Sequence, residues 1–220
     1  MTGMGYYQNV RPEMLPFVPA NSRRVVEFGC GCGRFGSEVR RTIGAEVWGV
    51  ELSQDAAEQA RPVLDRVLTG DVLACMDQLP DRHFDCAVFN DILEHLVDPW
   101  LVLSKLREKL TDKGVVIASL PNIRQFGSLK RLVWDADFPY EDQGIYDRTH
   151  LRFFTRMSIT RMFHDSGYAP ERIVGINAGR PVRLFMRTAF AMAIFLGGIK
   201  VSDMQYQQFA VVARVPSSVI

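Results

Sequence analysis

The chain has 220 residues, of which 47% are hydrophobic and 23% charged, so it can bury one sizeable core but is too short for two ordinary α/β domains. We therefore expect a single domain over residues 1–220. Its 26 basic and 25 acidic residues leave a formal charge of +1, which gives no global electrostatic reason to expect a nucleic-acid partner.

The first residues lack the basic-then-apolar pattern of a secretory signal, so we expect a cytoplasmic protein. The four cysteines, Cys30, Cys32, Cys75 and Cys86, have a spacing that suits neither a disulfide framework nor a zinc site, and we expect reduced thiols. The longest apolar run, at 189–199, is well short of the ~20 residues that a membrane-spanning helix needs.

Short β-branched runs alternate with helical patterns along the chain. This alternation predicts an α/β fold of the Rossmann-like, doubly wound kind, with a mainly parallel seven-stranded sheet and helices on both faces. The predicted strands are 24–28, 46–51, 66–68, 84–89, 114–120, 172–176 and 207–215.

Two helices are clearly indicated. Asp98 can cap the first, Pro99 suits its first turn, and its apolar face recurs until Lys113 and Gly114 end it. The second runs from Thr155 to a stop at residues 166–167.

The pattern breaks at about 122–152, where aromatic and charged residues mix. A loop of this length is usually functional, so we expect a substrate or lid insertion. Its aromatic side chains would form either a platform for a sugar ring or a small satellite core, and its basic side chains would meet an anionic group. These are Trp134, Phe138, Tyr140 and Tyr146, and Arg124, Lys130 and Arg131.

An apolar helical segment is expected at about 183–199. Three roles are open for it: a buried helix, a homodimer contact, or a helix lying on a membrane surface as a peripheral contact. The last role would place the protein at the inner face of the membrane.

The stretch "VVEFGCGCGRFG" at 25–36 admits two interpretations. Gly31, Gly33 and Gly36 satisfy the dinucleotide fingerprint G-x-G-x-x-G, with Glu51 at about the distance of a ribose-binding acid. Shifted by two residues, the same letters read E-x-G-x-G-x-G. Both need glycines for a tight strand-to-helix turn that brings a ligand against backbone N–H groups.

Acids at the ends of the predicted strands discriminate between these interpretations. Glu27 stands at the end of the first strand, where its charge would repel a pyrophosphate but attract an ammonium and a sulfonium. Glu51 ends the second strand, Asp71 follows the third, and Asn90 and Asp91 follow the fourth. Together these residues outline a cationic nucleoside rather than a dinucleotide.

Five motifs in order over residues 23–122 resemble those of class I S-adenosylmethionine-dependent methyltransferases: the glycine loop, "VWGVELSQDA", "GDV", "FDCAVFNDILEHLVDPW" and "GVVIASLPN". The resemblance implies S-adenosylmethionine as the cofactor. It also implies a binding set in which Glu27, Gly29, Gly31 and Gly33 hold the methionine part, Glu51 the ribose, Asp71 and Val72 the adenine, and Asn90 the region near the sulfonium.

The second half of the chain carries a narrower likeness. The stretches "SLPNIRQFGSLKRL", "YEDQGIYDRTHLRFFT" and "QYQQFAVVARVP" resemble methyltransferases that accompany glycosyltransferases in bacterial surface-polysaccharide synthesis. This likeness implies a glycan or small-molecule acceptor that is methylated on a sugar hydroxyl.

A hydroxyl acceptor calls for a general base. His150 is the preferred candidate, with Asp147 to orient its imidazole; alternatively, Asp147 and Thr149 fix the loop through hydrogen bonds to backbone groups. His95 is the rival candidate, and it would otherwise form with Glu94 a polar pair in a short helical turn beside the cofactor.

Other interpretations stay open. The acceptor would be small and aromatic or quinone-like if the insertion proved apolar and uncharged around the site. A catalytically silent binding module and a nicotinamide-dependent dehydrogenase are the further alternatives. His83 and His164 are predicted at the surface, and no spacing of histidines and acids predicts a metal site.

Overall fold

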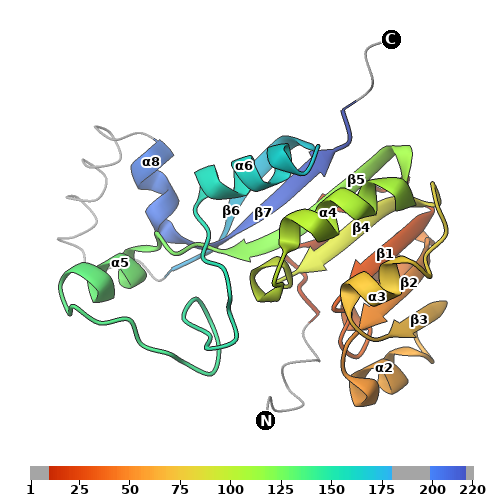
Figure 1. Cartoon of the computed structure of the whole chain (residues 1–220), viewed down its shortest axis with the longest axis horizontal. Coiled ribbons are helices and arrows are strands. Elements are labelled where there is room, and N and C mark those ends of the chain that lie inside the picture. The colour runs from red at the N-terminus through yellow and green to blue at the C-terminus, as the bar shows by residue number, and fades with distance from the viewer. Residues whose placement is uncertain (1–9, 180–198, 217–220) are drawn as a thin grey trace.

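The computed structural model describes residues 10–179 and 199–216, which form one seven-stranded sheet in the order β3-β2-β1-β4-β5-β7-β6 (Figure 1). Strands β1 to β5 run parallel, whereas β7 runs antiparallel to β5 and β6. The predicted Rossmann-like α/β class is confirmed. The strands are β1 (Arg24–Phe28), β2 (Glu46–Glu51), β3 (Arg66–Thr69), β4 (Phe84–Asn90), β5 (Leu110–Pro121), β6 (Ala169–Ala178) and β7 (Tyr206–Arg214).

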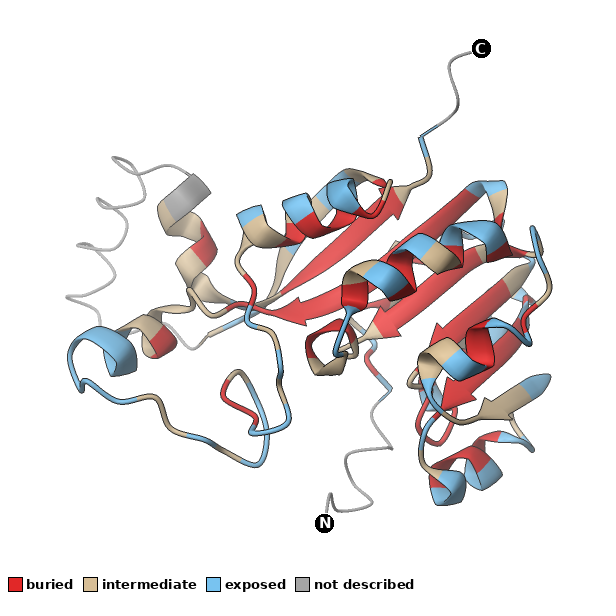
Figure 2. Cartoon of the chain, viewed as in Figure 1, coloured by how far each residue is buried: buried red, intermediate tan, exposed pale blue. Residues whose placement is uncertain are grey.

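Helices connect the strands on both faces of the sheet. They are α1 (Arg34–Ile43), α2 (Gln54–Ala60), α3 (Val72–Met76), α4 (Pro99–Lys109), α5 (Phe126–Val133), α6 (Arg156–Asp165) and α8 (Ile199–Ser202), with short 3-10 turns at Leu15–Phe17, Leu93–His95 and Asp203–Gln205. Figure 2 shows that the central strands are buried while the helices are exposed along their outer sides.

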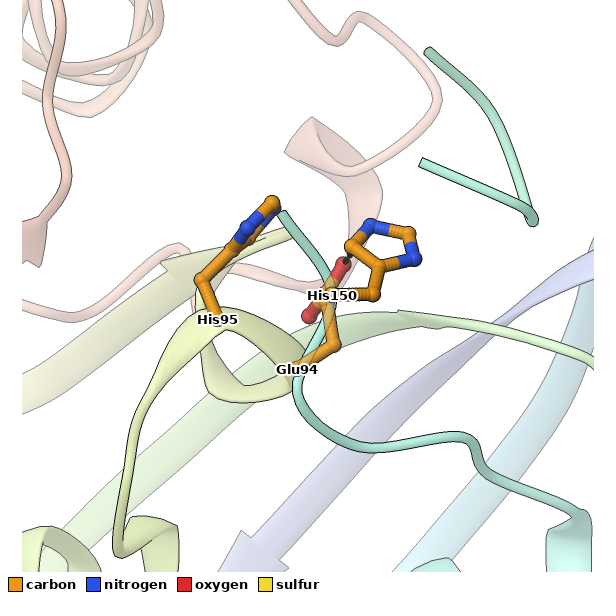
Figure 3. Close-up of side chains that lie close together, drawn as sticks. All are labelled: Glu94, His95 and His150. Atoms are coloured by element: carbon orange, nitrogen blue, oxygen red, sulfur yellow. Dashed lines mark ion pairs between the residues drawn. The ribbon is translucent and has the colours of Figure 1, made fainter. Parts of the chain in front are cut away.

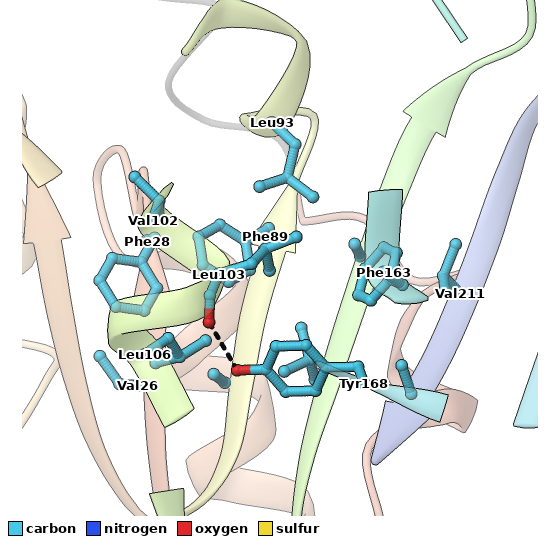
Figure 4. Close-up of a cluster of buried hydrophobic side chains, with 14 of the residues drawn as sticks. Val26, Phe28, Phe89, Leu93, Val102, Leu103, Leu106, Phe163, Tyr168 and Val211 are labelled. Carbon is cyan, nitrogen blue, oxygen red and sulfur yellow. Dashed lines mark hydrogen bonds between the residues drawn. The ribbon is translucent and has the colours of Figure 1, made fainter. Parts of the chain in front are cut away.

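Two buried clusters explain why the sheet needs helices on both sides. In β1, Val25 belongs to one cluster, and Val26 and Phe28 belong to the other, because successive side chains of a strand point to opposite faces. In the second cluster, Phe28 stacks on Phe89 of β4 with ring centroids 4.6 Å apart, and helices α4 and α6 cover this face (Figure 4).

The α4 region confirms one prediction and corrects another. Asp98 caps the helix, since its Oδ1 accepts a hydrogen bond from the N–H of Leu101 at 2.9 Å. The helix ends at Lys109, however, and not at the predicted Lys113–Gly114, because Leu110 is already extended and pairs with Phe84 at the start of β4. Leu110 is buried as a strand residue, although its spacing continues the apolar face of the helix.

Helix α6 has the predicted limits. The hydroxyl of Thr155 accepts from the N–H of Ser158 at 3.2 Å, and the hydroxyl of Ser158 accepts from the N–H of Thr155 at 2.9 Å. This reciprocal capping box satisfies two N–H groups at the start of the helix.

The insertion between β5 and α6 begins with an anchor and a helix. The side-chain amide of Asn122 donates to the carbonyls of Asp203 and Tyr206, at 2.9 and 3.0 Å, which fixes the insertion beside β7. Helix α5 follows within a region that the sequence pattern leaves as a loop.

Aromatic rings then form a small satellite core. The ring of Phe138 lies 4.9 to 5.5 Å from those of Tyr140, Tyr146 and Phe153, whereas Trp134 lies outside this cluster and is 84% exposed. Two of the three basic residues predicted to meet an anionic group form ion pairs within the insertion: Lys130 with Asp135, and Arg131 with Glu141. These pairs leave less positive charge for an anionic ligand.

No helix in the described ranges is long and apolar enough to cross a membrane. The segment predicted at 183–199 lies outside the described residues, apart from the start of α8.

Candidate cofactor and acceptor site

The glycine loop between β1 and α1 is shaped by left-handed backbone. Gly29, Gly31 and Gly33 have φ angles of 67°, 53° and 74°. A Cβ on Gly29 would lie 2.0 Å from Cδ1 of Ile92, so the loop also needs the missing side chain at that position. Gly33 caps α1 without a side-chain hydrogen bond, and the N–H of Gly36 in the first turn of the helix faces the carboxylate of Glu27.

Glu51, at the end of β2, holds this loop in place. Its carboxylate accepts hydrogen bonds from the N–H of Gly31 at 2.8 Å and of Ser53 at 2.9 Å. Because a carboxylate has about four acceptor positions, two remain for the hydroxyls of a ribose.

Glu27 and Asn90 lie side by side where β1 and β4 end. The amide of Asn90 donates to Oε1 of Glu27 at 3.4 Å, while Oε2 of Glu27 and Oδ1 of Asn90 are buried without a hydrogen-bond partner among the described residues. Burial raises the pKa of Glu27 to about 8, and the nearby charge of Glu51 acts in the same direction. Two unsatisfied acceptors of this kind fit a ligand group with several N–H donors, such as an ammonium.

Asp71 and Val72 follow β3, beside Glu51. The N–H of Gly70 donates to the carbonyl of Glu51 at 2.9 Å, so the two strand ends are adjacent. Asp71 caps α3, with its Oδ1 accepting from the N–H of Leu73 at 2.8 Å, and Val72 begins the helix. All the residues predicted for cofactor binding therefore lie at the carboxyl ends of the four neighbouring strands β1 to β4.

The cysteines of the glycine loop are packing residues. All four cysteines of the chain are free and buried, and burial raises the pKa of the Cys30 thiol. A thiol that stays protonated is a poor nucleophile, which agrees with a small side chain packed behind the loop.

His95 and His150 meet beyond the end of β4, although they are far apart in the sequence. His95 belongs to the 3-10 turn Leu93–His95, and His150 belongs to the insertion (Figure 3). Their rings are 4.7 Å apart, centroid to centroid. Burial lowers the pKa of both imidazoles, and each is therefore a neutral ring near pH 7.

Hydrogen bonds fix the same tautomer in both rings. Nδ1 of His150 lies 3.2 Å from the carbonyl of Ile145, and Nδ1 of His95 lies 3.3 Å from the carbonyl of Thr149. A carbonyl only accepts, so each Nδ1 carries the hydrogen and each Nε2 keeps its lone pair.

Asp147 does not orient His150 as the sequence interpretation suggested. Its Oδ1 accepts from the N–H and the hydroxyl of Thr149, at 2.8 and 2.6 Å, and so follows the alternative in which Asp147 fixes the loop. Burial would raise the pKa of Asp147, but the hydrogen bonds from Thr149 outweigh it and hold the pKa below its usual value. The hydroxyl of Thr149 also lies 3.1 Å from Nδ1 of His95, so Asp147 helps to position His95 through Thr149.

Glu94 completes this region and is the least expected of its residues. Its side chain is fully buried, and neither carboxylate oxygen has a hydrogen-bond partner among the described residues. Oε1 lies 3.9 Å from Nε2 of His150. Burial raises the pKa of Glu94 to about 8, with the charge of Asp147 acting in the same direction. We refer to Glu94, His95 and His150 as the histidine cluster.

Arg11 is a site residue that the sequence pattern does not indicate. Its side chain is 8% exposed, and its guanidinium pairs with Asp91 at the end of β4 and donates to Gln208 of β7 at 3.2 Å. Asp91 accepts further bonds from Ser119 at 2.7 Å and from Gln208 at 2.8 Å. A single arginine next to a proline carries no distinctive motif, so only the fold reveals this contact.

The two remaining histidines differ from each other. His164 is exposed on α6, as predicted. His83 is half-buried rather than fully at the surface, because its ring packs 5.6 Å from that of Trp48 in β2 and 4.9 Å from that of Phe84 in β4.

The fold, together with the polar residues at the carboxyl ends of β1 to β4, is that of a class I methyltransferase, an α/β protein that binds a nucleoside. Residues 5–173 match the family described as "Methyltransferase domain", and the chain belongs to that family. S-adenosylmethionine is the cofactor that this family indicates, so the glycine loop reads as E-x-G-x-G-x-G and not as a dinucleotide fingerprint.

Individual relatives agree with this assignment. The chain is 26% identical over 164 residues to the ubiquinone biosynthesis O-methyltransferase of Psychrobacter arcticus, covering 70% of this chain and 62% of that protein. It is 24% identical over 177 residues to a probable S-adenosylmethionine-dependent methyltransferase of Mycobacterium tuberculosis, covering 80% of this chain and 58% of that protein. The chain thus spans about six-tenths of the length of these curated relatives.

A solved structure shows the same fold. A S-adenosylmethionine-dependent methyltransferase from Archaeoglobus fulgidus has a TM-score of 0.64 to this chain at 19% identity, covering 96% of this chain and 94% of that one.

Proposed function

We propose that the protein transfers a methyl group from S-adenosylmethionine to a hydroxyl oxygen of a sugar or glycan precursor in the cytoplasm. When bound, the cofactor supplies an electrophilic methyl group on a sulfonium. Glu27, Asn90 and the glycines Gly29, Gly31 and Gly33 would hold its methionine part, and Glu51 its ribose. Asp71 and Val72 would lie against its adenine.

The observation that carries the choice of a hydroxyl acceptor is the pair of neutral imidazoles beyond β4. A hydroxyl is a poor nucleophile while it keeps its proton, and an imidazole nitrogen with a free lone pair can take that proton. His150 is the proposed proton acceptor, with His95 beside it. Asp147 would keep this part of the insertion in position through Thr149.

The polarity of the same region supports a sugar rather than an aromatic acceptor. Glu94 and the two histidines gather where the insertion meets the end of β4, Asp147 lies in the same loop, and Arg11 pairs with Asp91. An apolar, uncharged lining would have favoured a quinone-like acceptor. Polyols need several hydrogen-bonding groups of this kind for recognition.

A quinone-like acceptor is the second candidate. The name of the Psychrobacter relative favours it, and the aromatic satellite core approaches the histidine cluster, because the ring of Phe153 lies 6.3 Å from that of His150. Both candidates share transfer to oxygen and differ in the body of the acceptor.

The first test is calorimetric titration with S-adenosylmethionine and, separately, with a nicotinamide dinucleotide. We expect saturable binding of the first alone. The protein is then incubated with S-adenosylmethionine and with panels of nucleotide-linked sugars and of catechols. A sugar product heavier by one methylene, with the new methyl located on oxygen by NMR, supports the proposal. Methylation confined to catechols replaces it with the second candidate.

A further inference from the structure

The histidine cluster brings three potential metal ligands together. Glu94 and His95 come from the 3-10 turn after β4, His150 comes from the insertion, and one donor atom of each lies within 4.8 Å of the others (Figure 3). The sequence spacing gives no hint of this set, because the third member joins it only through the fold.

Each imidazole is prepared as a ligand would be. Histidines that bind metals commonly donate their other ring N–H to a carbonyl or carboxylate, which fixes the tautomer and the ring orientation. Nδ1 of His95 and Nδ1 of His150 make such bonds to the carbonyls of Thr149 and Ile145, and neither Nε2 makes a hydrogen bond to a described residue.

Glu94 supplies the second, independent observation. A fully buried carboxyl group whose two oxygens have no hydrogen-bond partner among the described residues is costly in an apolar interior. The charge of Arg11 acts on Glu94 and lowers its pKa, but the ion pairs of Arg11 with described residues are made to Asp91 and Glu13. A cation bound by Glu94 and the two imidazoles would satisfy all of these unused acceptors at once.

We propose that Glu94, His95 and His150 bind one divalent cation of the Zn²⁺, Co²⁺ or Mn²⁺ type at the acceptor side of the cofactor site. Two imidazole nitrogens and one carboxylate are a donor set that suits these borderline ions. Bonds of about 2.0–2.2 Å place neighbouring donors about 3.0–3.5 Å apart. The donors of Glu94 and His150 are 3.9 Å apart and all three lie within 4.8 Å, so binding would draw them together by up to about 1–2 Å.

This inference rests on the proposed function for the role of the cation, though not for its binding. Three protein ligands leave coordination positions open. An acceptor hydroxyl bound there would lose its proton more readily, with solvent water as the proton acceptor, so that the cation would take over the activation otherwise assigned to the Nε2 lone pair of His150.

Binding is tested on the tag-free full chain after treatment with a chelator. Zn²⁺ is titrated by calorimetry, and Co²⁺ is titrated while its visible absorption spectrum is recorded. We expect one equivalent to bind, with a Co²⁺ spectrum of nitrogen and oxygen ligation. Glu94→Gln, His95→Gln and His150→Gln should each weaken binding at least tenfold, whereas His164→Gln, which changes an exposed histidine on α6, should bind as the unchanged chain does.

Thermal unfolding and S-adenosylmethionine binding of each variant show whether it is folded. Absence of saturable binding up to millimolar Zn²⁺ and Co²⁺ would overturn the proposal, as would unchanged affinity in folded His150→Gln. The outcome for the proposed function is separate: metal binding without methylation of any acceptor would overturn the hydroxyl-transfer proposal and leave the cation site standing.

Discussion

The carboxylate of Glu51 accepts a hydrogen bond from the backbone N–H of Gly31 at 2.8 Å, so the end of β2 fixes the loop that follows β1. Glu51→Gln keeps the shape but replaces one acceptor oxygen with a donor. We expect the free energy of unfolding to fall by about 1–3 kcal/mol, and S-adenosylmethionine affinity to fall about tenfold or more. Chemical denaturation and calorimetry measure the two effects.

Glu58→Gln is the matched control, since Glu58 is exposed on the neighbouring helix α2. It should change stability by less than about 0.5 kcal/mol. Equal behaviour of the two variants would show that Glu51 does not organise the loop.

Gly29→Ala tests the close approach of the glycine loop to the residue after β4. Gly44 has nearly the same φ angle, 68° against 67°, but a Cβ there would meet no atom within 4 Å. Gly44→Ala should therefore lower the free energy of unfolding by about 1–2 kcal/mol, the cost of placing alanine in a left-handed backbone conformation. Gly29→Ala should cost at least about 1 kcal/mol more, because its Cβ collides with Ile92.

A double variant isolates the collision. Adding Ile92→Ala to Gly29→Ala should recover the excess cost in a double-mutant cycle measured by urea unfolding. Purely additive losses would mean that backbone strain alone explains the effect.

Glu27 predicts a pH dependence of cofactor binding. Its pKa of about 8 lies above the ordinary value of 4.5, because burial disfavours the charged form. The ammonium of the cofactor favours that charged form, so affinity should rise from pH 6 to about pH 8 and level off above it. The side chain of Glu27→Gln cannot ionise. Subtracting the pH profile of cofactor affinity of this variant from that of the unchanged chain removes the contribution of the cofactor's own titration.

The same shift predicts the stability of the chain without cofactor. A pKa that is raised on folding means that the folded state holds its proton more tightly than the unfolded state. The contribution of Glu27 to the free energy of unfolding is therefore complete below about pH 4.5 and is lost as pH rises toward 8. A profile identical to that of Glu27→Gln would contradict the assignment.

His150→Ala should separate turnover from cofactor binding. Loss of the group that activates the acceptor should lower kcat by about 100-fold or more, while S-adenosylmethionine affinity stays within about twofold. His164→Ala, at an exposed site, should leave both unchanged. Equal turnover in the His150 variant would remove this residue from the chemistry.

The sequence predicts that the proposed cofactor residues meet at one edge of the sheet, for a physical reason. Residues such as Glu27 and Glu51 sit at the ends of hydrophobic runs, and parallel strands bring their carboxyl ends to one edge whatever the details of packing. Strand ends are visible in a one-dimensional pattern, and so their meeting place can be inferred.

The acceptor half is set by contacts that no local pattern records. Arg11 reaches Gln208 across 197 positions. The sequence predicts Glu94 as part of a polar pair in a short helical turn, but it does not predict that the side chain is fully buried. Helix α4 ends earlier than predicted for a similar reason: Leu110 continues the apolar spacing of the helix but pairs with Phe84 as a strand residue.

The antiparallel strand β7 has a consequence for how the protein is made. It lies inside the sheet, between β5 and β6, although it follows both in the chain. On the ribosome, β6 leaves the exit tunnel before the strand to which it pairs, and the edge of β5 stays unpaired until β7 has emerged. Strands β1 to β5 can therefore pair during synthesis, whereas the rest of the sheet forms only after residues 206–214 have been made. A nascent chain stalled before these residues would expose the unpaired edges of β5 and β6 to chaperones and to other chains.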